Sequence, residues 1–241
     1  DPGLLSRRGR SYNRPQATAP NIVLVTVDAL RSDHVSSYGY ARNTTPNLDG
    51  LAAQGARFLQ ASTTSPWTYA ANAAMVTGQS PTRLGASWNV AGLPGAMPTL
   101  AGLLQGAGYQ TAGFASAVLI RKTYGFDRGY DHYDDSATYG YPNSAQNMAQ
   151  EVNQRTLAWL DANRDPNKPL FLYIYYFDPH SWYNPPAPYD TLYDNTYTGA
   201  VTPEVIEDGQ SIVGGTVTPT ARDMEHILAL YDGEIDRQSV V

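Results

Sequence analysis

The chain has 241 residues, of which 42% are hydrophobic and 16% are charged, a composition typical of a globular protein. Its 16 Lys and Arg against 22 Asp and Glu give a net charge of −6, which argues against a general nucleic-acid binder because such proteins need a basic face. The apolar stretches are far shorter than the roughly 20 residues of a membrane span, and the lack of Cys excludes disulfides and thiolate metal sites.

The first predicted core element follows a polar N-terminal stretch. Residues 1–20 carry four Arg and are interrupted by Pro and Gly, so we expect a flexible arm ahead of the domain. The run 21–27 is apolar and rich in β-branched residues, without polar alternation. That pattern is typical of a strand buried on both faces of a mainly parallel sheet. Asp28 ends this predicted strand.

Predicted helices and strands alternate along the rest of the chain. Helices are expected at 45–55, 70–77, 99–106, 144–163 (capped by Ser144) and 220–236, and strands at 56–61, 109–115 and 170–177. This alternation predicts a three-layer α/β/α fold with a mainly parallel central sheet. The stretch 182–218, rich in Tyr, Pro, Asn and Gly, predicts a surface excursion, so 21–241 is expected to form one α/β domain.

Polar residues follow two of the predicted strands, at the sheet edge where α/β proteins form their sites. A carboxylate such as Asp28 at the end of an apolar strand is unfavourable to bury unless it is paired or bound to a metal, for which a hard divalent cation is the natural partner. The alternative is that Asp28 caps the following turn. Asp33 and His34, a few residues later, are interpreted as surface or turn residues, and Asp178 to His180 follow the later strand.

A second candidate region precedes the helix predicted at 70–77. It contains a cluster of Ser and Thr hydroxyls, from Ser62 to Thr68. A hydroxyl at a helix N-terminus is well placed as a nucleophile, because the free N–H groups and the helix dipole favour an anion there. The alternative is an ordinary Ser or Thr N-cap, which is far commoner.

Several segments carry a family resemblance when they are taken in order. They are Asp28-Ala-Leu-Arg-Ser-Asp-His34, Thr45-Pro-Asn-Leu-Asp49, Thr77-Gly78 and Asp178-Pro-His180. In order and spacing they resemble the sulfatase branch of the alkaline-phosphatase superfamily over residues 21–241, which implies the corresponding alkaline-phosphatase/sulfatase-like fold. Family members are longer and continue into an Asp-His-Gly segment that completes a metal site. No such segment occurs before Val241, so the chain is expected to be a truncated or N-terminal part.

The resemblance implies roles for Asp28 and Thr68. Asp28 falls on a metal-ligand aspartate of the family, whereas Ala29 stands where many sulfatases have a second one. The family nucleophile lies nine residues before the Thr-Gly pair, which places it on Thr68. The resemblance implies that Thr68 is also a metal ligand. Threonine is not a substrate for oxidation to formylglycine, so none is expected. The arrangement also resembles the phosphodiesterase and phosphotransferase branches of the superfamily, which have an unmodified Thr at the nucleophile position.

The resemblance also implies roles for Asn72 and His180. Asn72 stands where sulfatases have Arg and is expected to bind a substrate oxygen without supplying charge, while Ala70 and Ala71 replace Pro and Ser. His180 falls on a histidine that faces the sulfate or the leaving group, and it is expected to bind substrate and to protonate the leaving oxygen. The alternative is a loop histidine held by its neighbours.

Two functions follow from these residues. The first is a metal-dependent hydrolase of sulfate or phosphate esters of small molecules or glycans, with Thr68 as nucleophile and Ca, Mg, Mn or Zn as the divalent ion. The second is a catalytically lapsed relative that acts in binding, for example of a glycan on the aromatic-rich stretch 182–197. Neither needs nucleic acid or a membrane span in this chain. The resemblance to mostly exported enzymes implies a periplasmic or extracellular location.

Overall fold

The computed structural model describes residues 19–86, 92–138, 148–181, 183–202, 215 and 217–240. In these residues one sheet contains β1 (Ile22–Val27), β2 (Gln110–Ala115), β3 (His132–Asp134) and β4 (Leu170–Tyr176), in the order β1-β4-β2-β3. Every neighbouring pair is parallel, so each connection has to cross over the sheet. The predicted parallel sheet is confirmed.

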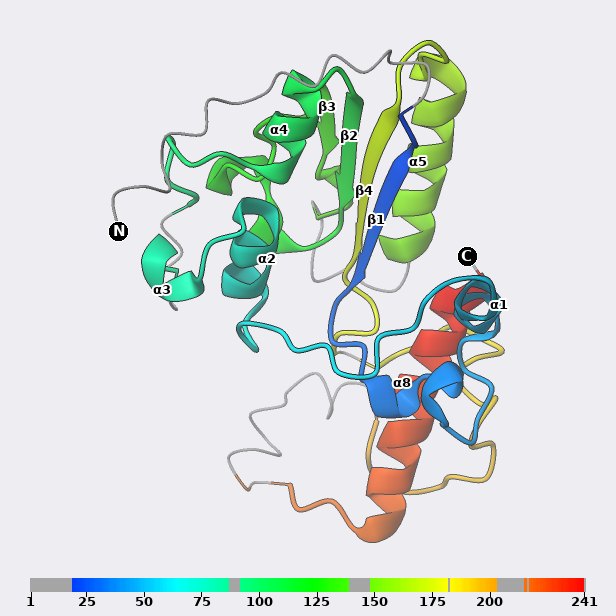
Figure 1. Cartoon of the computed structure of the whole chain (residues 1–241). Coiled ribbons are helices and arrows are strands. Elements are labelled where there is room, and N and C mark those ends of the chain that lie inside the picture. Colours follow the sequence, from blue (N-terminus) through cyan, green and yellow to red (C-terminus); the bar gives the residue numbers. More distant parts are fainter. Residues whose placement is uncertain are drawn as a thin grey trace.

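Helices cover both faces of this sheet. Helices α2 (Thr68–Thr77) and α4 (Leu100–Gly106) lie on one face and α5 (Met148–Asn163) lies on the other (Figure 1). Successive side chains of β4 divide between two cores: Tyr173 packs with the α2 and α4 side, whereas Leu172 packs with the α5 side. The predicted three-layer α/β/α architecture is therefore confirmed.

Strand β1 lies at an edge of the sheet, and the prediction that both of its faces are buried was wrong. Ile22 and Leu24 pack against the core on the α2 side. Val23 and Val25 point to the other face, and they are 56% and 48% exposed. Helix α5 packs against β2 and β4 and leaves this side of β1 uncovered in the described part of the chain.

Two predicted helices lie in their predicted places and two have shifted ends. Helix α1 (Pro46–Gln54) and α4 occupy their predicted places, and the Oγ1 atom of Thr99 caps α4 by accepting from Gly102 N at 3.1 Å. Helix α2 begins two residues earlier than predicted and stops at Gly78, whose φ of 67° suits a left-handed C-cap. The last helix, α8 (Ala221–Val240), extends beyond its predicted end, and the Ser144 cap lies outside the described residues.

Other elements differ from the prediction. Residues 56–61 form no strand, and Phe58 and Leu59 are exposed there. Strand β3 and the short helix α3 (Pro81–Leu84) were not predicted. Within the described residues, five short 3-10 helices were also missed: η3 (Ser32–His34), η4 (Ser36–Tyr38), η5 (Val118–Ile120), η6 (Lys122–Tyr124) and η7 (Ser136–Thr138).

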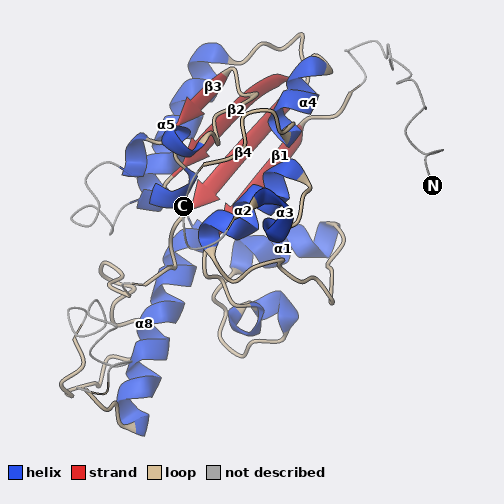
Figure 2. Cartoon of the chain, turned by 90° about the vertical axis from the view of Figure 1, so that its left-hand side faces the viewer, coloured by secondary structure: helices blue, strands red, loops and turns tan. Residues whose placement is uncertain are grey.

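Helix α8 lies beyond the carboxyl ends of the strands (Figure 2), together with the segment 183–202, which Figure 1 shows beside it in yellow to orange. This segment contains no helix or strand, and it packs on α8 through a small apolar cluster of Val201, Ile227 and Leu230. Among the described helices, none has both the length and the apolar character needed to cross a membrane.

Candidate active site

Asp28 and Thr68, 40 residues apart in the sequence, meet at the carboxyl end of the sheet. The Asp28 N–H donates to the carbonyl of Tyr176 at 2.9 Å, which continues the β1–β4 ladder by one residue. The Thr68 hydroxyl donates to Asp28 Oδ2 at 3.2 Å, and both residues are half-buried. The structure thus brings together two residues that were predicted to share a site.

Thr68 is the first residue of α2 and does not cap it. The N-cap position belongs to Trp67, whose side chain makes no cap hydrogen bond. The Thr68 hydroxyl therefore lies beside the free backbone N–H groups of the first helical turn, where a negative charge is favoured. Its partner is a carboxylate from another element, which rules out the ordinary N-cap interpretation for this residue.

Asn72 is buried beneath Thr68 and is held from two sides. Its Nδ2 atom donates to the Thr68 carbonyl at 2.8 Å, and its Oδ1 atom accepts from the Tyr173 hydroxyl at 3.2 Å. Burial raises the pKa of Tyr173, and burial together with the Asp28 carboxylate raises the pKa of Tyr175, so both phenols keep their protons at neutral pH. The Tyr175 phenol also interacts with Asn72 and with Asp28.

His180 lies in the turn after β4, apart from this group. Its ring stacks on Phe177 with centroids 4.4 Å apart, and its Nδ1 atom lies 3.0 Å from the carbonyl of Ser181. In the described part of the chain the ring has hydrogen bonds only within this turn, so the structure does not link His180 directly to Asp28 or Thr68. Its Nε2 atom makes no hydrogen bond to the described residues.

The donor atoms of Asp28 and Thr68 fit part of a divalent-cation site. A carboxylate and a hydroxyl are oxygen donors, which hard cations prefer, but such cations take about six or more ligands. Within the described residues, no group of three or more His, Cys, Asp or Glu could hold a metal ion. Asp28 and Thr68 therefore supply one side of an oxygen-rich shell that needs further ligands.

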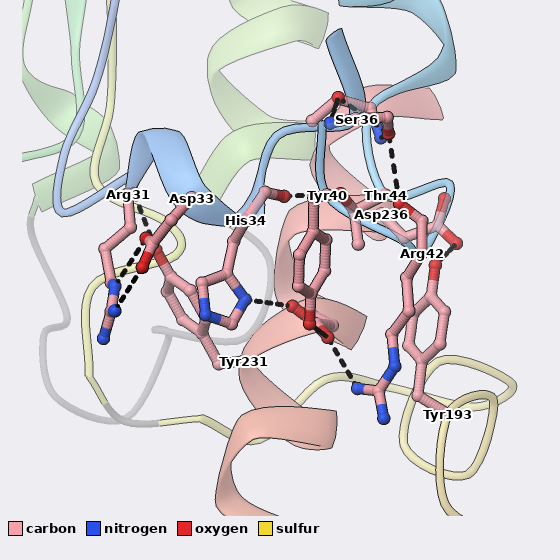
Figure 3. Close-up of polar contacts among 12 residues, drawn as sticks. Arg31, Asp33, His34, Ser36, Tyr40, Arg42, Thr44, Tyr193, Tyr231 and Asp236 are labelled. Carbon is pink, nitrogen blue, oxygen red and sulfur yellow. Dashed lines mark hydrogen bonds and ion pairs between the residues drawn. The ribbon is translucent and has the colours of Figure 1, made fainter. Parts of the chain in front are cut away.

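His34 lies in the short 3-10 helix η3 and is buried, so the expectation that it lies at the surface was wrong. It is 5% exposed, and its Nδ1 atom lies 2.6 Å from Oδ1 of the fully buried Asp232. Tyr40 and Arg42 donate to Oδ2 of the same carboxylate, each at 2.6 Å (Figure 3). One sequence feature could have predicted this network: Asp232 directly follows the apolar run 227–231, as a buried carboxylate would.

A second buried charged group was also missed. Arg237 Nη1 donates to Glu234 Oε2 at 3.2 Å, and Arg237 Nη2 lies 3.8 Å from Asp178 Oδ2. Burial raises the pKa of Asp178. Burial, reinforced by the Asp178 charge, raises the pKa of Glu234 to about 7. These residues tie the C-terminal part of α8 to the turn after β4.

Comparison with known proteins agrees with this fold. A family model described as Sulfatase matches residues 20–236. The chain is 28% identical over 194 residues to the N-acetylglucosamine-6-O-sulfatase of Bacteroides thetaiotaomicron, a match that covers 76% of this chain and 35% of that protein.

Solved structures share the fold at low sequence identity. The phosphonate monoester hydrolase of Agrobacterium radiobacter superposes with a TM-score of 0.70 at 17% identity, covering 92% of this chain and 57% of that one. The C-terminal periplasmic domain of EcEptC from Escherichia coli, in complex with Zn, has a TM-score of 0.57 at 17% identity and coverages of 94% and 60%. The chain thus spans little more than half of these solved chains and about a third of the curated relative.

Proposed function

The chain belongs to the sulfatase family, and we propose that it supplies the nucleophile of a metal-dependent hydrolase of sulfate or phosphate esters. The observation that carries this proposal is the hydrogen bond from the Thr68 hydroxyl to Asp28, made at the N-terminus of α2. It places a hydroxyl, a carboxylate and free backbone N–H groups around one point beyond the sheet. The relative named above supports a sulfated sugar as the substrate class.

In the proposed reaction, the Thr68 oxygen attacks sulfur or phosphorus in line with the leaving oxygen. A bond forms to Thr68 Oγ1 as the bond to the leaving oxygen breaks, and the Thr68 proton passes to Asp28, which already accepts it in a hydrogen bond. His180 is proposed to enter the reaction as an imidazolium and to give its Nε2 proton to the leaving oxygen. Water then attacks the same sulfur or phosphorus and gives a proton to His180, while the bond to Thr68 Oγ1 breaks and this oxygen takes its proton back from Asp28. A divalent cation bound at Asp28 and Thr68 would supply Lewis acidity and lower the pKa of the hydroxyl.

Asn72 is the proposed contact to a non-bridging oxygen of the substrate. Its amide is held by two hydrogen bonds, to the Thr68 carbonyl and from Tyr173, so it is preorganised. It brings no positive charge, however, and Ala70 and Ala71 add no polar group on the first turns of α2. We therefore expect slower turnover than a site with a cationic residue at this position would support.

The second candidate is a catalytically lapsed protein that binds a glycan. It is favoured by the lack of charge on Asn72 and by the apolar side chains of Ala70 and Ala71, which leave few groups to hold a sulfate. The likeness to a periplasmic domain supports the proposal, common to both candidates, that the protein works in the periplasm or outside the cell.

The two candidates are separated by assays on the intact protein with an aryl sulfate, an aryl phosphate monoester and an aryl phosphodiester, with divalent cations varied. Thr68→Ala should lower turnover by roughly 10³-fold or more. Thr77→Ala is the matched control, because it removes a hydroxyl from the opposite end of α2, where it donates to Ala73 O at 2.6 Å. We expect it to keep turnover within about twofold, as a change remote from the reacting groups.

Each outcome of this assay decides between the candidates. Cation-dependent turnover that disappears in Thr68→Ala supports the hydrolase. Wild-type turnover in Thr68→Ala contradicts Thr68 as nucleophile. No turnover of any ester, with binding of a sulfated sugar unchanged in Thr68→Ala, favours the lapsed binding protein.

A further inference from the structure

The residue directly after Asp28 has a backbone conformation that L residues rarely adopt. Ala29 has a φ of 54°, and it is the one non-glycine residue with positive φ in the part of the chain that the structure describes. In this region the Cβ atom crowds the backbone, so the conformation persists only where its surroundings hold it. The turn after Asp28 therefore needs an external restraint.

The Tyr231 hydroxyl of α8 supplies that restraint. It donates to the carbonyl of Ala29 at 2.7 Å and accepts from the N–H of Arg31 at 2.9 Å, so one oxygen closes the turn from both sides. The Tyr231 ring is 3% exposed and packs edge-on against His34 and Tyr183, with centroids 5.0 and 5.2 Å apart. Its hydroxyl is thus held in place by the ring.

Asp28 is fixed between this turn and the sheet. Its own N–H is bonded to Tyr176 O, and the next peptide is held by Tyr231. Loss of the Tyr231 bond would free the peptide that follows Asp28, which is one of the two ends that hold the Asp28 backbone. The carboxylate that this backbone carries accepts from the Thr68 hydroxyl at 3.2 Å.

The neighbouring residue of α8 anchors the helix that carries Tyr231. Asp232 is fully buried and holds His34, Tyr40 and Arg42, three side chains from the segment that follows the turn (Figure 3). Tyr231 and Asp232 together therefore bind the chain at 29–42 to one rigid helix. Tyr231 cannot move away from the turn without disturbing this buried network.

We propose that Tyr231 is a positioning residue for the site: its hydroxyl holds the strained turn at Ala29 and so keeps Asp28 directed at Thr68 and at a bound divalent cation. This inference rests on the proposed function, in which Asp28 and Thr68 bind that cation. It adds to that function a residue more than 200 positions away in the sequence, on an element that contributes no ligand in the proposal.

The test compares four forms of the intact protein: wild type, Tyr231→Phe, the double variant Tyr231→Phe with Ala29→Gly, and Tyr197→Phe. Tyr197→Phe is the matched control, since the Tyr197 hydroxyl also makes one donated bond, to Asp223 at 2.5 Å, and one accepted bond, from Val201 N at 2.9 Å, away from the turn. Titration calorimetry with Mg²⁺, Ca²⁺, Mn²⁺ and Zn²⁺ in turn measures cation affinity. Hydrogen exchange measures protection of the amides at 28–31.

We expect Tyr231→Phe to lower the affinity for the tightest-binding cation by about 10- to 100-fold, as for other groups that orient a metal ligand. Exchange at 28–31 should speed up in the same variant. Ala29→Gly should recover part of the affinity, because glycine adopts positive φ without crowding and no longer needs the restraint. Tyr197→Phe should match wild type in both measurements.

The outcomes separate this inference from the function on which it rests. Wild-type affinity or wild-type exchange at 28–31 in Tyr231→Phe would overturn the inference alone. A loss of affinity that Ala29→Gly does not relieve would also overturn the inference, because the turn would then not be the cause of that loss. A wild-type protein that binds none of the four cations would contradict the proposed function and the inference with it.

Discussion

Asp232 of α8 lies 2.6 Å from His34, across 198 residues of sequence, and it also accepts from Tyr40 and Arg42. No part of this carboxylate is exposed to solvent. The three contacts of this buried carboxylate join α8 to the segment that follows β1. They therefore fix the position of α8 relative to the strand that carries Asp28.

Asp232→Asn should destabilise the protein by about 3 kcal/mol or more, because it removes the charge of a fully buried carboxylate that accepts from Tyr40 and Arg42. Asp33→Asn is the control: Asp33 pairs with Arg31 at 2.6 Å, but the pair is about 60% exposed, so its loss should cost no more than about 1 kcal/mol. Urea unfolding of the three proteins measures both changes. Equal effects of the two substitutions would contradict the structural role of Asp232.

Glu234 should make stability depend on pH near neutrality. Its pKa is raised from 4.5 to about 7. A raised pKa means that the folded state keeps a proton that the unfolded state releases above pH 4.5. The stabilisation is therefore complete below that pH and is lost as the pH rises through about 7, a change on the order of 3 kcal/mol.

Glu234→Gln should flatten the fall in unfolding free energy between pH 5 and pH 8, measured by urea unfolding at steps of one unit. The matched control is Glu225→Gln on the same helix, whose side chain is 72% exposed and should leave the wild-type slope unchanged. If the slope of Glu234→Gln equals that of wild type, Glu234 does not titrate in this range.

Asn72→Ala should cost about 1–3 kcal/mol of stability, because it leaves the buried Tyr173 hydroxyl without its Asn72 acceptor. Adding Tyr173→Phe should recover part of that loss, since both polar partners are then gone. Thermal unfolding of the two single variants and the double variant gives the coupling between them. Purely additive effects would mean that this hydrogen bond does not fix Asn72.

Gly129→Ala should destabilise the protein by about 3 kcal/mol or more, because it combines strain with a steric clash. Gly129 has a φ of 86°, and a Cβ atom there would lie 2.1 Å from the backbone N of Gly102 in α4. Gly50→Ala is the opposite case: it lies inside α1 with open space around it, and should raise helix stability by up to about 1 kcal/mol. A tolerated Gly129→Ala would contradict the close packing of α4 against this turn.

Much of the architecture follows from local signals. Helix α2 and its stop at Gly78, the cap at Thr99 and the apolar run of β4 each have a pattern within a few residues. The edge position of β1 has no such pattern, because it depends on which strand pairs with it, and its partner β4 lies about 150 residues away. The missed strand β3 has only three residues, too few for a periodic pattern.

The site was predictable only in part, for a related reason. The spacing in the family resemblance pointed to Asp28 and Thr68, and the structure places them in contact. The restraint by Tyr231 has no sequence signal, since it depends on the backbone at Ala29 and on a contact across 202 residues. His34 was misread because its burial comes from packing against α8.

The central claim, that Thr68 is the nucleophile, is tested most directly by trapping the intermediate. The intact protein is mixed with an excess of the ester that it turns over, quenched in acid and digested, and the peptide that contains Thr68 is examined by mass spectrometry. We expect the mass of one sulfuryl or phosphoryl group on Thr68, and none in Thr68→Ala. Turnover without any label on Thr68, or a label that persists at another residue in Thr68→Ala, would contradict the claim.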